Sequence, residues 1–125
     1  MPPERPYFLD LVAIRLPIGG MVSILHRASG AVLSLAIPCL LYLWMLSLRS
    51  PQDFQRLADW FGGVFGWLLF LGLIWALLHH FLAGLRHLGF DLGWGEAKEV
   101  ARKTAWVVLF AAAGLTALIA LWRLA

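Results

Sequence analysis

The chain has 125 residues, of which 62% are hydrophobic and only 14% are charged, and its net charge is +3. A soluble domain of this length has too little interior to hide so much apolar surface. The composition therefore argues against a soluble enzyme or binding module, and we expect no nucleic-acid partner.

Uncharged stretches divide the chain into three long segments. Residues 28–48, 60–85 and 104–122 contain no Asp, Glu, Lys or Arg. Each reaches the roughly 20 residues that a helix needs to cross the hydrocarbon core of a bilayer. The sequence predicts an all-α integral membrane protein that forms a single domain over residues 1–125, with three transmembrane helices at approximately 23–48, 60–86 and 103–123.

Lys and Arg are unevenly distributed between the two sides of such a protein. With three spans, the N-terminal segment and the second loop share a side, which carries Arg5, Arg15, Arg27, Arg86, Lys98, Arg102 and Lys103. The other side has only Arg49, Arg56 and Arg123. The positive-inside rule then places the N-terminus in the cytoplasm and the C-terminus outside. A bacterial inner membrane is the expected setting, and a mitochondrial inner membrane, with the matrix as its inner side, is the less favoured one.

The first 21 residues are too polar to span a membrane. Their apolar residues form a short amphipathic piece that we expect to lie in the inner interface. Pro17 and the pair Gly19-Gly20 are expected to break this piece before the first span begins.

Three polar residues mark the mouth of the first span. Ser23, His26 and Arg27 occur at i, i+3 and i+4, so they share one face of a helix. An arginine at this depth is often only an anchor whose charge reaches the interface. Grouped with a hydroxyl and an imidazole, it favours a polar pocket for a lipid-soluble ligand with hydrogen-bonding oxygens.

The first loop carries a helix-start signal. Ser50 can act as the N-cap and Pro51 as the first helical residue. We assign no chemistry to this loop.

The second span ends in a pattern that favours haem binding. His80, Gly84, His87 and Asp91 recur at i, i+4, i+7 and i+11, so they share one helical face. A neutral imidazole is a good ligand for haem iron, and a glycine one turn away leaves room for a flat macrocycle. His79 points about 100° away from His80 and is expected to hydrogen-bond a neighbouring helix or a carbonyl. The role of Asp91 stays open between proton handling and an ordinary surface carboxylate or ion pair with Arg86.

These two groups of residues, in the first and second spans, are expected at similar depths in the membrane, so we expect them to form one site. His80 lies about 9 Å from Arg86 along a helix axis, at 1.5 Å per residue, which places its ring in the inner half of the membrane. Arg27 and His87 are level with the inner boundary, where they can pair with the propionates of haem b. The third span, by contrast, has only Thr104 and Thr116 as polar side chains and is expected to serve packing.

These residues resemble a known family. The segment SILHRASG, residues 23–30, and the segment HFLAGLRHLGFD, residues 80–91, match the motifs S-I-x-H-R-x-[ST]-G and H-x3-G-x-R-H-x3-D of the cytochrome b membrane anchor of succinate dehydrogenase, respiratory complex II. The resemblance extends over essentially the whole chain.

The resemblance implies a role for each matching residue. It implies that His80 is an axial ligand of haem b, that the other ligand comes from a second small anchor subunit, and that Gly84 packs against the haem. It places His26, Arg27 and His87 near the haem propionates, and Ser23 and Arg27 at a ubiquinone site towards the cytoplasmic side. It further implies a flavoprotein subunit with FAD and an iron–sulfur subunit with its clusters as partners, so the isolated chain would have no turnover.

Several alternatives remain at this point. An anchor of a fumarate reductase-type complex has the same architecture, and a haem-free structural anchor would use His80 only for packing. A transporter or proton channel would spread ionisable groups over the whole membrane depth, whereas here they gather in the inner third. A membrane di-metal oxidase would need more His and carboxylate ligands than the chain has.

Overall fold

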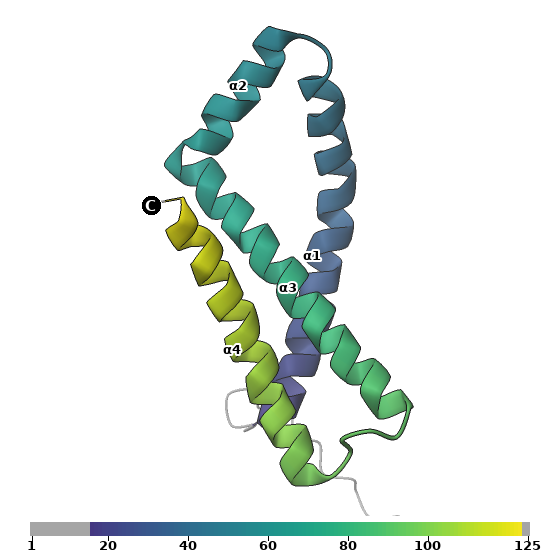
Figure 1. Ribbon diagram of the computed structural model, residues 1–125. Helices are drawn as coiled ribbons and strands as arrows, with labels where there is room; N and C mark the ends of the chain where they lie inside the picture. The colour runs from purple at the N-terminus through teal and green to yellow at the C-terminus, as the bar shows by residue number, and fades with distance from the viewer. Residues whose placement is uncertain (1–15, 124–125) are drawn as a thin grey trace, which may run out of the picture.

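A computed structural model describes residues 16–123 of the chain as four α-helices (Figure 1). They are α1 (Ile18–Ser47), α2 (Pro51–Gly62), α3 (Val64–Asp91) and α4 (Lys98–Trp122). Helices α1, α3 and α4 are long and apolar enough to cross a membrane. The predicted all-helical membrane protein with three spanning helices is therefore confirmed.

Helix α1 begins earlier than the sequence indicates. Pro17 is its N-cap, and the Pro17 carbonyl accepts from the backbone N–H groups of Gly20 and Met21 at 2.8 and 3.2 Å. The expected break is confirmed at Pro17, which is extended and precedes the helix, but it is wrong at Gly19-Gly20, because both glycines lie in the first turn. The helix then continues through Pro38 to Ser47. The expected interfacial piece falls largely on residues 1–15, outside the described residues.

A short helix, α2, connects the first two spans. The Ser50 hydroxyl accepts from the backbone N–H of Asp53 at 3.0 Å, so the predicted N-cap is confirmed. Gly63 then adopts an extended conformation with φ −74° and ψ 165°, which ends α2 and starts α3. For this reason the second spanning helix begins at Val64, whereas the sequence places its start near residue 60.

Helix α3 crosses α1 and packs on both α1 and α4, and the beginning of α1 also contacts α4 (Figure 1). Small side chains form the contact: Val22 of α1, Ala83 of α3, and Ala105 and Val108 of α4 make one buried cluster. Small residues allow helix backbones to approach closely in lipid, where burial of apolar surface gives little driving force.

The turn after α3 brings α4 back along the bundle. The Trp94 N–H donates to the Gly89 carbonyl and the Gly93 N–H donates to the Phe90 carbonyl, both at 2.8 Å. This is the Schellman arrangement, and it needs Gly93 because its φ is +78°. The turn sets the start of α4 beside the end of α3 and the beginning of α1.

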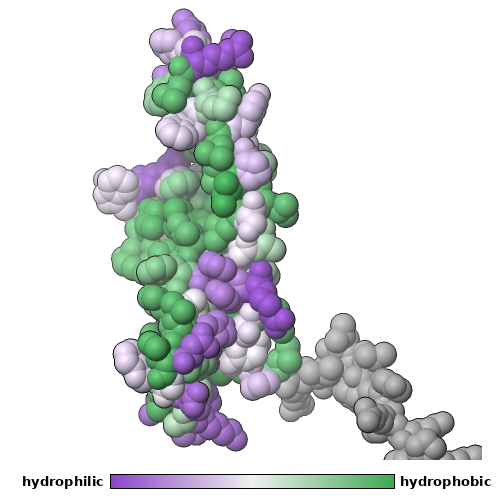
Figure 2. Space-filling model, turned by 90° about the vertical axis from the view of Figure 1, so that its right-hand side faces the viewer, coloured by the Kyte–Doolittle hydropathy of each residue, from purple (hydrophilic) through white to green (hydrophobic). Residues whose placement is uncertain are grey.

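Most large apolar side chains point outward. Phe65 and Trp122 are 85% and 82% exposed, and many Leu, Val and Trp side chains are more than half exposed. Figure 2 shows this surface as green through the middle of the molecule, with most hydrophilic residues near the top and in the lower half. Such a surface is stable in hydrocarbon and unfavourable in water.

Candidate functional site

Three imidazoles gather where α1 crosses α3. The His26 ring of α1 stacks on the His80 ring of α3, with centroids 4.2 Å apart and planes 13° from parallel. The His87 ring lies on the other side of His26, with centroids 5.1 Å apart. The predicted face of α3 and the predicted face of α1 therefore meet, and His26 joins them.

The backbone of α1 holds the ring of His80 in one orientation. His80 Nδ1 lies 2.9 Å from the backbone carbonyl oxygen of His26, a carbonyl that also accepts from the Ser29 hydroxyl at 3.0 Å. A carbonyl oxygen only accepts, so Nδ1 carries a proton and donates. In the neutral ring the other nitrogen, Nε2, then keeps a free lone pair, which is the state of an imidazole prepared to bind a metal.

Two residues one turn after His26 complete the surroundings of the His80 ring, which we call the cradle. The Ser29 side chain is buried, and its Oγ lies 3.4 Å from His80 Nδ1. At Gly30, an added Cβ would come within 2.7 Å of His80 Cε1. Only glycine therefore leaves room for the His80 ring against α1. Sequence reasoning gave no role to Ser29 or Gly30, although both lie one turn beyond His26 on the same face.

Gly84 has a different neighbour from the one expected. An added Cβ there would lie 3.4 Å from His26 Nε2, so the His26 ring occupies the clearance beside Gly84. Gly84 lies beside the His26 ring, which lies between those of His80 and His87.

Ser23 and Arg27 are placed at the same end of α1, one on each side of His26 in the sequence. Ser23 is partly exposed and Arg27 is exposed. Within residues 16–123, neither side chain has a hydrogen bond or an ion pair in the structure.

His79 is fully buried, with 0% of its surface exposed, and its ring stacks on Trp75 with centroids 5.2 Å apart. It faces the interior of the bundle, as its angle from His80 requires. Neither ring nitrogen meets hydrogen-bond geometry among the described residues, but the backbone of Val22 on the neighbouring helix α1 lies close enough to interact with the ring.

Arg86 has partners that the sequence did not indicate. Its Nε donates to the Thr104 hydroxyl at 3.1 Å and its Nη2 donates to the Ala101 carbonyl at 3.0 Å. Thr104 therefore links α3 to α4 through a polar contact, so the expectation that its span serves packing alone is incomplete. The alternative ion pair between Asp91 and Arg86 does not form in the described part of the chain, where Asp91 is exposed at the end of α3.

The described residues contain no group of three or more His, Cys, Asp or Glu side chains placed to hold a metal ion. The three clustered imidazoles meet through their ring faces and edges, and only His80 has its ring fixed by a backbone carbonyl. The arrangement therefore offers one oriented imidazole nitrogen, that of His80, beside the stacked ring of His26.

Comparison with known proteins supports the family resemblance drawn from the sequence motifs. Residues 1–119 match the family described as the succinate dehydrogenase/fumarate reductase transmembrane subunit. The chain belongs to this family. It is 38% identical to a succinate dehydrogenase cytochrome b556 subunit of Paracoccus denitrificans over 105 residues, 82% of this chain and 78% of that one.

Two further relatives have the same character. A cytochrome b556 subunit of Coxiella burnetii is 36% identical over 109 residues, 84% of this chain and 85% of the relative. A succinate dehydrogenase cytochrome b560 subunit of Reclinomonas americana is 35% identical over 113 residues, 85% of this chain and 77% of the relative. The resemblance drawn from the two motifs is confirmed, and the chain is a multi-pass membrane anchor of the complex II type.

Proposed function

We propose that this chain is the anchor subunit of a succinate:quinone oxidoreductase that binds haem b together with a second small anchor subunit. The observation that carries the proposal is the hydrogen bond from His80 Nδ1 to the His26 carbonyl. It fixes the ring and leaves Nε2 as the ligand atom for the haem iron. The names of the relatives, cytochromes b556 and b560, support the same cofactor.

The residues around His80 suit the two ends of a haem. Imidazole and apolar side chains surround the proposed ligand, while His26, Arg27 and His87 can donate to propionates near the membrane boundary. Gly84 is proposed to border the haem through the His26 ring that it accommodates. When bound, haem b supplies a one-electron redox centre within the membrane.

Ser23 and Arg27 are proposed to form this chain's part of the quinone site. The Ser23 hydroxyl can donate to one quinone oxygen, and the Arg27 guanidinium can stabilise the negative charge that develops on it during reduction. Two electrons and two protons convert the quinone, ubiquinone by the resemblance, to the quinol. The electrons come from FAD and iron–sulfur clusters on the flavoprotein and iron–sulfur subunits, so this chain acts only within the complex.

The proposed site lies on the cytoplasmic side of the cell inner membrane. Seven of the ten Lys and Arg residues fall on the side of the N-terminus and the α3–α4 turn, which also holds Arg27 and His87. The hydrophilic subunits would dock on this face. We favour succinate oxidation over fumarate reduction as the direction in which the complex works, because the relatives named above are all succinate dehydrogenase subunits.

A reduced-minus-oxidised absorbance spectrum of the purified complex tests the haem proposal. The wild-type complex is expected to show a low-spin b-type signal that is lost in His80→Ala and kept in the adjacent control His79→Ala. Assembly of the subunits is followed by gel filtration, so that loss of haem is separated from loss of the complex. An assembled, quinone-active complex with no haem would leave the chain as a structural anchor and contradict the proposal.

A further inference from the structure

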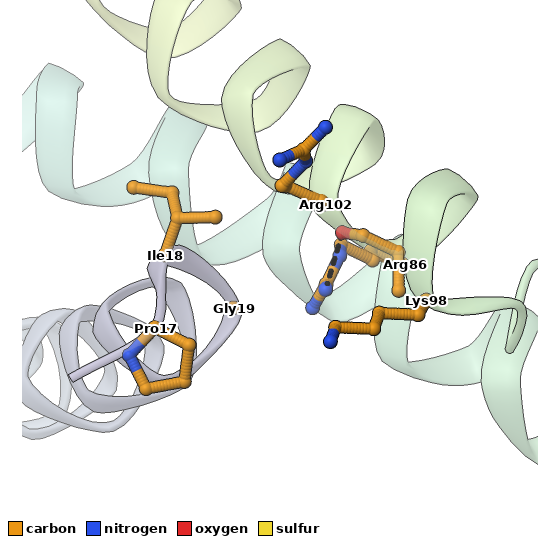
Figure 3. Close-up of a pocket in the computed structure, with 7 residues that line it drawn as sticks. Pro17, Ile18, Gly19, Arg86, Lys98 and Arg102 are labelled. Carbon is orange, nitrogen blue, oxygen red and sulfur yellow. Dashed lines mark hydrogen bonds between the residues drawn. The ribbon is translucent and has the colours of Figure 1, made fainter.

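A second site with charged side chains lies on a different face of α3 from His80, because Arg86 comes six residues later, about 120° around the helix. A cavity of about 320 Å³ opens between the beginning of α1, the end of α3 and the beginning of α4. Its lining residues are Pro17, Ile18, Gly19, Arg86, Lys98, Ala101 and Arg102 (Figure 3). None of these residues belongs to the proposed haem or quinone site.

Arg86 is held rigidly at the back of this cavity. Hydrogen bonds to Thr104 and Ala101 fix its guanidinium on α4, and the group also lies over the Phe90 ring, 4.4 Å from its centroid. Gly19 of α1 lies close to the same group, since an added Cβ would be in van der Waals contact with Arg86 Nη2, 3.4 Å away. A charge that is already oriented loses little freedom when a ligand binds.

Lys98 supplies a second charge to the same space. Figure 3 shows the Arg86 and Lys98 side chains both directed towards the gap in front of Gly19. In the described part of the chain no carboxylate lies within ion-pair distance of either group, whereas Arg102 pairs with Glu99 at 2.9 Å. The cavity thus has two positive charges without a counter-ion among residues 16–123.

The remaining walls are apolar. Pro17, Ile18 and Ala101 contribute hydrocarbon to them. A free inorganic anion would gain little from such walls, whereas an amphiphile with a phosphate head and a hydrocarbon tail would match both parts. Arg86, six residues after His80, lies near the end of its spanning helix, the depth at which we expect the phosphates of a leaflet.

We propose that this cavity binds the phosphate of an anionic phospholipid from the leaflet on this side of the membrane. The phosphate lies between Arg86 and Lys98, and the first carbons of the lipid pass along Ile18 and Ala101. Both groups are donors that phosphate oxygens accept from readily. The lipid therefore contacts all three spanning helices and stabilises their packing at this end.

The test measures binding of phosphatidylglycerol to the full-length chain, purified with its associated subunits in detergent and stripped of lipid. Native mass spectrometry counts the bound lipids, and phosphatidylcholine is the uncharged comparison. Lys98→Gln is expected to weaken phosphatidylglycerol binding about fivefold, the effect of one cation near a membrane surface. Lys103→Gln, which removes an exposed charge from another face of α4, is expected to leave it unchanged.

Arg86→Gln is expected to have a larger effect, and its thermal unfolding is recorded because Arg86 also links α3 to α4. Lys98→Gln decides the matter if Arg86→Gln does not fold. Equal loss in Lys98→Gln and Lys103→Gln would overturn the proposal in favour of diffuse surface charge. Displacement of the lipid by equimolar inorganic phosphate would also overturn it, and so would binding that appears only after the hydrophilic subunits are removed, since the cavity would then be a protein-docking surface.

Discussion

The two halves of the α1–α3 pair are built differently. In the half that contains His26 and His80, which we call the histidine half, the helices meet through imidazoles, a buried serine and a glycine. In the half next to α2, which we call the α2 half, an open apolar groove of about 510 Å³ lies on the surface. Its lining residues are Leu40, Phe61, Gly62, Trp67, Phe70, Leu73 and Arg123.

The difference shows that side chains with a fixed orientation are concentrated in the histidine half. Polar groups in a membrane protein must find partners, and each hydrogen bond fixes a side chain in one orientation. The histidine half contains such bonds between α1 and α3. In the α2 half, the polar contact within the groove's lining is the Arg123 guanidinium on the Gly62 carbonyl, at 2.5 Å, which holds α4 to the end of α2. We therefore expect substitutions in the histidine half to alter chemistry and those in the α2 half to alter stability alone.

The largest difference between the halves is expected for their exposed arginines. Arg27→Ala in the histidine half should lower quinone reductase activity by about 10- to 100-fold, the value of a hydrogen bond from a charged donor. Ser23→Ala should lower it by about tenfold, because a neutral donor is lost. Steady-state assays with a soluble ubiquinone analogue measure both.

The matched control is Arg123→Ala in the α2 half, whose contacts are Gly62 and the Trp67 ring. It should leave quinone reduction unchanged. Succinate oxidation by an artificial dye should persist in all three variants, since it does not require the quinone site. If Arg27→Ala and Arg123→Ala behave alike, the assignment of the quinone site to the histidine half is wrong.

Glycines give a second comparison. Gly30→Ala forces a methyl group to within 2.7 Å of His80 Cε1, so the ring or α1 must move. Overpacking of this kind costs about 1–3 kcal/mol, and we expect a lower haem content per complex together with a changed b-type spectrum. Gly72→Ala in α3 meets no atom within 4 Å in the described structure. It should leave both quantities unchanged, and equal haem loss in the two variants would contradict the cradle around His80.

The sequence predicts the parts of this site that depend on helical periodicity. Charge-free stretches located the spans, and the spacing of His80, Gly84 and His87 placed them on one face, as the structure has them. Periodicity does not tell which helices touch. The contact of His80 with the His26 carbonyl, and the need for glycine at position 30, depend on how α1 crosses α3 and could not be read from either segment alone.

Two further misses concern Thr104 and the pair Gly19-Gly20. The sequence suggested that the span containing Thr104 serves packing alone. The partner of Thr104, Arg86, lies 18 residues earlier in the chain, and the α3–α4 turn brings the two side chains together. Gly19 and Gly20 are turn-forming residues in isolation, yet here they lie in the first turn of α1, directly after its N-cap Pro17. Local propensity alone therefore did not decide where this helix begins.

A smaller effect, on stability, is expected from a substitution of His79 in the histidine half. Its buried ring has no hydrogen-bond partner among residues 16–123, so an apolar residue of similar size avoids the cost of burying two unpaired nitrogens. We expect His79→Leu to raise the free energy of unfolding by about 1 kcal/mol, with the b-type spectrum retained. The midpoint of thermal unfolding in detergent measures the change. A loss of stability would mean that the stacking on Trp75 or an unseen bond outweighs the unpaired nitrogens.

The smallest effect is expected at the N-cap of α2, far from the imidazoles. Ser50→Ala removes the acceptor for the Asp53 N–H, which costs about 1 kcal/mol in comparable helices. Pro51 keeps the first turn preorganised, so α2 should persist with faster amide hydrogen exchange at its start. Ser50→Asp, which keeps an acceptor, should restore the protection, and neither variant should alter haem content or quinone reduction. A functional loss in Ser50→Ala would instead show that the α2 half is coupled to the histidine half through α1, which ends beside α2, and α3, which begins there.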